Sequence, residues 1–400
     1  MDERGPWLTI VGIGEDGPDG LSAASRAALA QAELVFGAAR HLSLLPDLTS
    51  ETRTWPVPFE AGIADLLKQR GRRVVMLASG DPFWFGAGAT LSRHLSRAEW
   101  VAYPAPSTFA LAAARLGWRV EETICLGLHA APVTRLRPHL APGARIVALV
   151  RDGAGARALI DYIAQQGFGA SAVTMLESLG GPRERVRTTA AEAAPFTDIA
   201  HPIAVAIEVA GSGDTLPLAA GLPDAWFDHD GQITKRPARA LTLSALAPRA
   251  GELLWDIGTG SGSIAIEWLL AHPSTRAIAF ERDPVRAARA RTNAAALGVD
   301  HLAVVEGAVP AVLIDQPTPT AVFVGGGLSS ALLDWLAAHL SAGTRVVVNA
   351  VTLESEALLS QWHARRGGSL LRIELAEAAP IGARRGWRSA YPLVQWSVTW

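Results

Sequence analysis

Short apolar runs alternate with longer alanine-rich stretches along both halves of the 400-residue chain. Apolar runs of about four to eight residues predict buried strands, and the longer stretches predict helices. The strands predicted in the first half are Trp7–Ile13, Arg73–Ala78, Trp100–Tyr103, Arg145–Val150, Ser171–Leu176 and Ile203–Val209. The helices predicted there are Leu21–Ala32, Thr108–Leu116 and Ala156–Gln166. This alternation is typical of α/β folds with largely parallel sheets.

Two stretches interrupt the alternation. The prolines between Gly127 and Gly143 predict a hinge between two subdomains of the first half, and the stretch from Gly211 to Gly231, rich in Gly, Pro and Asp, predicts a linker. Single hydrophobic cores stop growing at roughly 250–300 residues, so we expect two domains. The predicted division is a domain over residues 1–210, a linker over 211–231 and a second domain over 232–400.

The second half has a distinctive order of elements. Its predicted strands are Leu253–Ile257, Arg276–Phe280, Leu302–Val305, Ala321–Val324, Thr344–Asn349, Leu370–Glu374 and Pro392–Thr399. Helical stretches separate the first six strands, whereas none lies between the last two, so we expect the last strand to return antiparallel. This ending is typical of class I S-adenosylmethionine (SAM) methyltransferases and uncommon in dehydrogenase Rossmann domains.

A glycine-rich turn follows the first strand of the second half, with Asp256 two residues before its first glycine. The turn consists of Gly258, Thr259, Gly260, Ser261 and Gly262. Its G-x-G-x-G spacing differs from the G-x-G-x-x-G of dinucleotide binders, and it predicts a site for the aminoacyl end of SAM at a helix N-terminus. Glu281 ends the next strand, where a carboxylate for ribose hydroxyls is expected. Gly325–Gly327 leave room for a large flat substrate or simply form a turn.

Two loops of the first half are candidates for a second site. Gly80 and Asp81 form a polar turn after a strand, beside an aromatic cluster that can line a pocket. Ser107 and Thr108 follow the next strand, where they either cap a helix or contact a cofactor. The G-x-G-x-x-G match that begins at Gly12 is expected to be a decoy, because a proline follows it before any helix can open. This argues against an NAD-dependent oxidoreductase.

Composition narrows the function classes. The chain has 36 basic and 38 acidic residues, which argues against a protein held mainly by nucleic-acid phosphates. It also disfavours the alternative of an RNA methyltransferase. Cys125 is the single cysteine, so no intrachain disulfide can form, and we expect it in the core. No apolar stretch reaches the ~20 residues of a membrane span, and no signal peptide is evident, so we expect a cytoplasmic protein without membrane partners.

Ordered motifs in each half resemble a known family. Residues 12–22, 78–88, 103–118 and 176–186 are similar to the motifs of the tetrapyrrole methylase (class III) family. Residues 233–246, 255–268, 304–310, 322–327 and 347–356 resemble the decarboxylating methyltransferases of cobalamin synthesis. The fusion in this order is similar to the decarboxylating precorrin C(5,15)-methyltransferases.

This resemblance implies both a fold and an activity. The fold is an N-terminal tetrapyrrole methylase of two α/β subdomains, fused to a C-terminal Rossmann-like class I SAM methyltransferase with a seven-stranded sheet. The enzyme would methylate precorrin-6B at carbons 5 and 15 and decarboxylate the ring C acetate, giving precorrin-8. In this family the second half performs the carbon 15 transfer and the decarboxylation, which leaves carbon 5 to the first half. Relatives of the two halves are commonly oligomers, so a homo-oligomer is expected.

The resemblance also transfers residues. Cofactor contacts are expected at Thr234, Gly258, Thr259, Gly260, Ser261, Gly262, Glu281, Ala308, Gly80, Asp81, Ser107 and Thr108. At Ala308 the family often has an aspartate, so only backbone contacts are expected there. Lys235, Arg236 and Arg239 either bind substrate carboxylates or are solvated charges at a helix start. Arg384, Arg385 and Arg388 either cap the site or lie on an exposed hairpin. We identify no catalytic side chain and no metal-ligand spacing.

Overall fold

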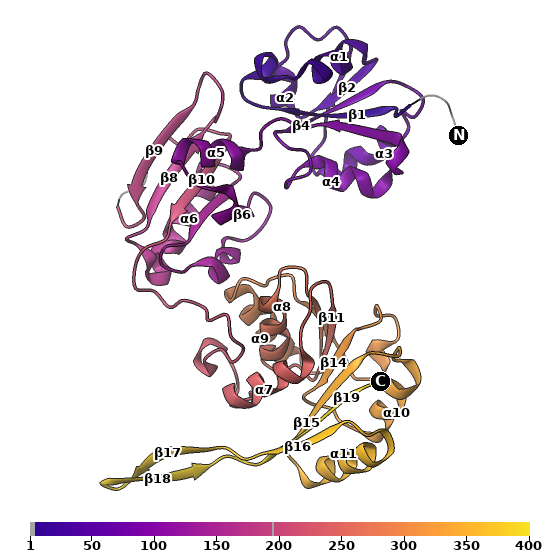
Figure 1. Ribbon diagram of the computed structural model, residues 1–400, viewed down its shortest axis with the longest axis vertical. Coiled ribbons are helices and arrows are strands. Elements are labelled where there is room, and N and C mark those ends of the chain that lie inside the picture. Colours follow the sequence, from indigo (N-terminus) through magenta and orange to yellow (C-terminus); the bar gives the residue numbers. More distant parts are fainter. Residues whose placement is uncertain (1–4, 194–195) are drawn as a thin grey trace. The chain divides into compact units, whose positions relative to one another are not determined.

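The computed structural model describes residues 5–193 and 196–400 of the chain (Figure 1). These residues divide into two compact units. The first unit contains the chain up to Val133 together with His139–Asp214. The second unit contains Thr134–Pro138 together with Thr215–Trp400.

The later part of the predicted linker is packed against the second unit. Leu216, Leu222 and Phe227 are buried in the core of that unit. The backbone N–H groups of Gly221 and Leu222 also donate to the buried carboxylate of Glu267, at 2.6 and 2.9 Å. This part of the chain therefore belongs to the second unit and is not a free connection.

The first sheet of the first unit is parallel, with strand order β3-β2-β4-β1-β5. Its strands are β1 (Leu8–Ile13), β2 (Leu34–Gly37), β3 (Glu51–Thr54), β4 (Val74–Ser79) and β5 (Trp100–Tyr103). Its α-helices are α1 (Ala23–Gln31), α2 (Ala39–Ser43), α3 (Ile63–Leu67) and α4 (Ala87–Leu91). Strands β1 and β4 are nearly continuous apolar runs, as expected of strands covered on both faces.

The second sheet of the first unit is mixed, with order β6-β7-β10-β8-β9 and only β6 and β7 parallel. Its strands are β6 (Thr123–Gly127), β7 (Arg145–Leu149), β8 (Ala172–Glu177), β9 (Arg185–Ala190) and β10 (Ile203–Glu208). Helices α5 (Thr108–Leu116) and α6 (Gly153–Ile163) accompany it. Cys125 lies half-buried on β6 and packs against a hydrophobic core cluster of the first unit, so its side chain is at the edge of the core and not in its interior.

The predicted hinge is misplaced. The chain leaves the first sheet after β5 and enters the second through α5, before Gly127. The prolines between Gly127 and Gly143 interrupt the pattern for a different reason, since Thr134–Pro138 leave the sheet and belong to the second unit.

The second unit contains all the predicted strands of the second half, in the order β13-β12-β11-β14-β15-β19-β16. They are β11 (Leu253–Ile257), β12 (Arg276–Glu281), β13 (Ala303–Glu306), β14 (Ala321–Val324), β15 (Arg345–Ala350), β16 (Ser369–Ile373) and β19 (Leu393–Thr399). The α-helices are α7 (Arg236–Leu246), α8 (Ser263–Ala271), α9 (Pro284–Ala296), α10 (Ser330–His339) and α11 (Leu353–Arg366). Strand β19 is antiparallel to both of its neighbours, which confirms the predicted ending.

A two-stranded hairpin, which was one of the two alternatives for the basic group near the end of the chain, lies between β16 and β19 (Figure 1). It consists of β17 (Ala376–Ile381) and β18 (Arg384–Ser389). Trp387 is 77% exposed on it, and the basic group Arg384, Arg385 and Arg388 is exposed as well. The exposed-hairpin interpretation of these arginines is therefore the correct one.

Two further findings concern membrane-spanning helices and metal sites. None of the helices in residues 5–193 and 196–400 is both long and apolar enough to cross a membrane. In the same residues, no cluster of three or more His, Cys, Asp or Glu side chains is arranged to hold a metal ion.

Candidate active sites

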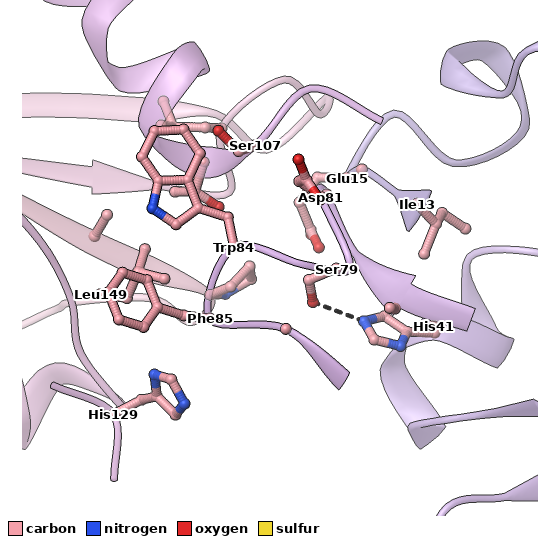
Figure 2. Close-up of a pocket in the computed structure, with 18 of the residues that line it drawn as sticks. Ile13, Glu15, His41, Ser79, Asp81, Trp84, Phe85, Ser107, His129 and Leu149 are labelled. Atoms are coloured by element: carbon pink, nitrogen blue, oxygen red, sulfur yellow. Dashed lines mark hydrogen bonds between the residues drawn. The ribbon is translucent and has the colours of Figure 1, made fainter. Parts of the chain in front are cut away.

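A cavity of about 360 Å³ lies between the two sheets of the first unit (Figure 2). The carboxyl ends of β1 and β4 line one side of it, and residues of β7, β8 and β10 line the other. The four predicted first-half residues, Gly80, Asp81, Ser107 and Thr108, all line this cavity. The fold thus brings two loops that are far apart in sequence to one site.

Two glycines allow the loops around this cavity to pack closely. A Cβ added to Gly12 would lie 2.0 Å from the carbonyl oxygen of Gly80 and 2.5 Å from the amide nitrogen of Ala105. Gly80 itself has φ +51°, a conformation that side chains disfavour. Gly12 therefore serves strand-to-loop packing. The prediction that its motif is a decoy is confirmed, because a 3₁₀ turn (Gly17–Gly20) follows it and α1 starts later, capped by Ser22.

The two predicted polar side chains differ in their contacts. One carboxylate oxygen of Asp81 accepts the N–H of Phe83 at 2.8 Å, which holds the turn. The Ser107 hydroxyl accepts the N–H of Ala110 at 3.1 Å. Ser107 therefore caps α5, which was one of the two roles predicted for it. The second carboxylate oxygen of Asp81 therefore takes no part in holding the turn. The Ser107 hydroxyl lies beside the cavity, but its hydrogen bond with Ala110 serves to cap α5.

A polar cluster that the sequence analysis did not identify lines the same cavity. Glu15 is buried and forms ion pairs with Arg40 and, at 3.4 Å, with Arg183. His41 and Ser79 contact each other beside it. Glu15, Ser79 and Arg183 lie within the family motifs, whereas Arg40 and His41 come from the short helix α2, which carries no motif, so only their convergence in space identifies the cluster. Opposite this cluster lie the aromatic side chains of Trp84 and Phe85, so the cavity has one polar and one apolar side (Figure 2).

The glycine-rich loop of the second unit adopts a conformation that only glycine accommodates easily. Gly258, Gly260 and Gly262 have φ values of +70°, +56° and +80°. A Cβ on Gly258 would lie 2.5 Å from the Cα of Gly326. The glycines after β14 therefore allow this loop to pack against them, in addition to forming a turn.

Two carboxylates flank this loop. Glu281 accepts the N–H of Gly260 at 3.0 Å with one oxygen and the N–H of Asp283 at 3.1 Å with the other. Asp256 accepts the Thr259 hydroxyl at 2.7 Å and the Ala265 N–H at 3.1 Å through Oδ2. Burial raises the pKa of Asp256 to about 6, and the nearby Glu281 charge adds to this. Glu281 is thus held where it can accept ligand hydroxyls.

The loop fits a ligand with polar groups at both ends. The Oδ1 atom of Asp256 is buried and has no hydrogen-bond partner in the described part of the chain, so it remains available to accept a hydrogen bond. Gly260 leaves open space where a side chain would stand, because an added Cβ there meets no heavy atom of the described residues within 4 Å. An unpaired acceptor, an open glycine and a positioned carboxylate together match a small ligand that carries an ammonium group and hydroxyls.

Replacing Asp256 with asparagine is expected to stabilise the second unit at neutral pH. The folded pKa of about 6 lies above the ordinary value of 3.8, so the charged carboxylate costs stability above pH 6. This cost disappears as the pH falls through 6 towards 3.8, and it amounts to about 3 kcal/mol at neutral pH. Thermal melts of both proteins at several pH values measure it. The gain should shrink at acidic pH, and a gain independent of pH contradicts this account.

The remaining predicted residues of the second unit are dispersed. The carbonyls of Ser261 and Thr234 accept from side chains within the unit, at 2.9 and 2.5 Å, and Ala308 is exposed beyond β13. Lys235 and Arg236 are exposed at the start of α7, and the Lys235 ammonium lies 3.8 Å from Asp224. These two cations can reach a ligand from solvent.

Arg239 requires a correction. Its side chain is fully buried, and its guanidinium donates to Glu267 at 2.5 Å and to the carbonyls of Thr234 and Leu222. It also pairs with Asp224 at 3.1 Å. Both alternatives for Arg239, a substrate contact and a solvated charge, are therefore wrong, because the side chain is buried and its donors are directed at groups of the protein that fix the segment before α7.

Family comparisons identify the class to which these two sites belong. Residues 7–194 match the family of tetrapyrrole (corrin/porphyrin) methylases, and residues 225–400 match the precorrin methyltransferase domain. The chain is therefore a methyltransferase with two different methyltransferase parts.

Similarity over the full length narrows the class. The chain is 51% identical, over 98% of its length and 96% of the relative, to a decarboxylating precorrin-6Y C(5,15)-methyltransferase of Sinorhizobium sp.. It is 40% identical to the enzyme of that name from Mycobacterium tuberculosis, over 98% of this chain and 99% of the relative. The chain belongs to the family of decarboxylating precorrin-6Y C(5,15)-methyltransferases.

A solved structure also matches part of the chain. The C-terminal domain of precorrin-6Y C5,15-methyltransferase from Rhodobacter capsulatus is 54% identical, with a TM-score of 0.45. The match covers 46% of this chain and 100% of that domain.

Proposed function

We propose that this chain acts in the cytoplasm as a SAM-dependent enzyme that methylates precorrin-6B at carbons 5 and 15 and decarboxylates the ring C acetate, giving precorrin-8. The observation that carries the proposal is the presence of two separate sites in one chain. The first unit has a cavity with one polar and one apolar side, and the second has a glycine loop flanked by Asp256 and Glu281. The names of the full-length relatives include both positions and the decarboxylation.

The two reactions divide between the units. We assign the carbon 5 transfer to the first unit, and the carbon 15 transfer with decarboxylation to the second. The full-length relatives are named as precorrin methyltransferases, which gives no support to the alternative of RNA methylation. For the substrate carboxylates of the second unit we propose the exposed cations Lys235 and Arg236.

The residues of the chain bind and orient, and the bound SAM would supply an electrophilic methyl group. In the second unit, the loop from Gly258 to Gly262 would hold the aminoacyl end, and Glu281 would accept the ribose hydroxyls. In the first unit, the turn at Gly80 and Asp81 would position the cofactor beside the cavity. Alignment of the reacting carbon with the methyl group lowers the barrier, by as much as ≈ 7–11 kcal/mol in the best intramolecular cases.

The mass of the product tests this proposal. The wild-type protein, incubated with SAM and reduced precorrin-6, should add two methyl groups and release one carbon dioxide. A Gly258→Arg variant should add one methyl group without decarboxylation, because it blocks the second-unit loop. An Asp81→Ala variant should lose the other methyl transfer. An unchanged precorrin mass in a wild-type protein that still binds SAM contradicts the substrate assignment.

The proposal includes a homo-oligomer. The hairpin β17–β18 exposes Ile381 and Trp387, and an isolated two-stranded hairpin is only marginally stable in water. These side chains are therefore candidates for a contact with a second copy of the chain. The mass of the protein in solution, measured by light scattering, tests this point.

A further inference from the structure

Two side chains in the first-unit cavity form a contact that the proposed cofactor contacts do not use. His41 lies in α2, and its side chain is almost completely buried, with 7% exposed. Its Nε2 atom is 2.8 Å from the hydroxyl oxygen of Ser79, at the end of β4. Ser79 is exposed, lines the cavity and directly precedes Gly80 and Asp81 (Figure 2). A buried imidazole is thus linked to the cavity through one hydroxyl.

The neighbouring arginine determines the direction of these hydrogen bonds. Arg40 donates from Nη2 to the Ser79 hydroxyl at 2.8 Å, and the same nitrogen lies 3.0 Å from Nε2 of His41. A guanidinium can only donate, so the Nε2 atom beside it carries no hydrogen and has one lone pair, which Arg40 and the Ser79 hydroxyl both face. Ser79 accepts from Arg40 and directs its own hydrogen towards Nε2. The imidazole is therefore placed to receive a proton through Ser79.

The electrostatic surroundings keep this imidazole neutral. Burial lowers the pKa of His41 to about 4, and the positive charge of Arg40 contributes. Arg40 is itself paired with Glu15, which also meets Arg183 from the loop between β8 and β9. His41 is therefore an unprotonated base throughout the neutral range.

Methylation of a bridging carbon requires such a base. When the enamine-like carbon attacks the methyl group, a carbon–carbon bond forms and the sulfur–carbon bond breaks, with its electron pair going to sulfur. The methylated carbon still carries its hydrogen. Conjugation across the bridge returns only when this hydrogen leaves as a proton and its electron pair re-forms the double bond.

We propose that Ser79 and His41 form the proton relay that removes this hydrogen in the first unit. The proton passes to the Ser79 oxygen while the Ser79 hydrogen passes to Nε2 of His41, and the imidazolium afterwards releases it to solvent. This inference rests on the proposed function and adds a catalytic pair to it.

A deuterium isotope effect tests the relay directly. The substrate is reduced precorrin-6 with deuterium at carbon 5, and the proteins are the wild type, His41→Gln, Ser79→Ala and the control His94→Gln. His94 is exposed on a 3₁₀ turn outside the cavity. Loss of a general base slows a reaction by about 10²–10⁴-fold. We expect such a loss of carbon 5 methylation in both relay variants, together with an isotope effect absent from the wild type and the control.

Two internal readouts separate a relay from a purely structural role. Carbon 15 methylation by the same protein molecules should be unchanged in His41→Gln. In the ligand-free wild type, ¹⁵N NMR should show His41 with a bare Nε2 and no protonation until the pH falls to about 4. Titration near the ordinary value of 6.5 contradicts the proposal.

The outcomes also separate the two proposals. If the wild-type protein does not methylate the precorrin, the proposed function fails and the relay fails with it. If the wild type methylates carbon 5 and both variants do so at the same rate, or more slowly without an isotope effect, only the relay is overturned.

Discussion

Replacing Gly258 with alanine is expected to weaken binding of the methyl donor to the second unit by about 30-fold to 10⁴-fold. Gly258 has φ +70°, and an added Cβ would lie 2.5, 2.6 and 2.7 Å from the Cα, N and O atoms of Gly326. Those neighbours are backbone atoms, which cannot move aside as a side chain can.

The expected size follows from two costs. A side chain in this backbone conformation costs about 1–3 kcal/mol. Overpacking against a fixed neighbour costs about 1–3 kcal/mol more. Together these costs are about 2–6 kcal/mol, and each 1.4 kcal/mol reduces the population of the binding-competent loop about tenfold.

Calorimetric titration with SAM measures this effect. The wild type should show two binding sites per chain, and Gly258→Ala should retain only the site of the first unit. The matched control is Gly251→Ala, because Gly251 has φ +81° but no heavy atom of the described residues near its added Cβ. It should retain both sites. Two normal binding sites in Gly258→Ala would contradict the interpretation that this loop needs glycine at residue 258 to bind SAM.

Replacing Arg239 with alanine is expected to destabilise the second unit by about 3–5 kcal/mol, because it leaves the buried carboxylate of Glu267 without its cation. The same substitution removes the donors to the carbonyls of Thr234 and Leu222. The segment before α7 then loses a main attachment to the unit.

Thermal unfolding measures this loss. For a unit of this size, 3–5 kcal/mol corresponds to a Tm decrease of roughly 6–20 °C. Arg236→Ala is the matched control, since Arg236 is exposed three residues earlier and should change stability by less than about 0.5 kcal/mol. A normal Tm in Arg239→Ala with weaker precorrin binding contradicts the structural role and restores the substrate role.

Local sequence patterns were sufficient for most of the second unit. The strands of its seven-stranded sheet are short, mainly apolar segments bounded by turns, and the glycine loop requires positive φ at residues that only glycine fills easily. Glu281 was found because its place follows from the parallel pairing of β11 and β12. Each of these signals depends on residues that are close together in the sequence or on a regular topology.

Two short edge strands of the first unit, β3 and β9, could not be predicted from the pattern of apolar residues. Strand β3 is Glu-Thr-Arg-Thr and lies at the edge of its sheet, and β9 alternates polar residues at another edge. Such strands form because a neighbouring strand supplies their hydrogen bonds, so their own residues carry little signal.

The sequence alone determined the two-part architecture, the order of the main strands and the glycine loop with its carboxylate, because backbone preference and hydrophobic period act between near neighbours. Only the tertiary structure decided the burial of Arg239, the exposed hairpin and the meeting of Glu15, His41 and Ser79 in one cavity. Burial, ion pairing and pKa depend on groups brought together from distant parts of the chain, and no local pattern records which of them will meet.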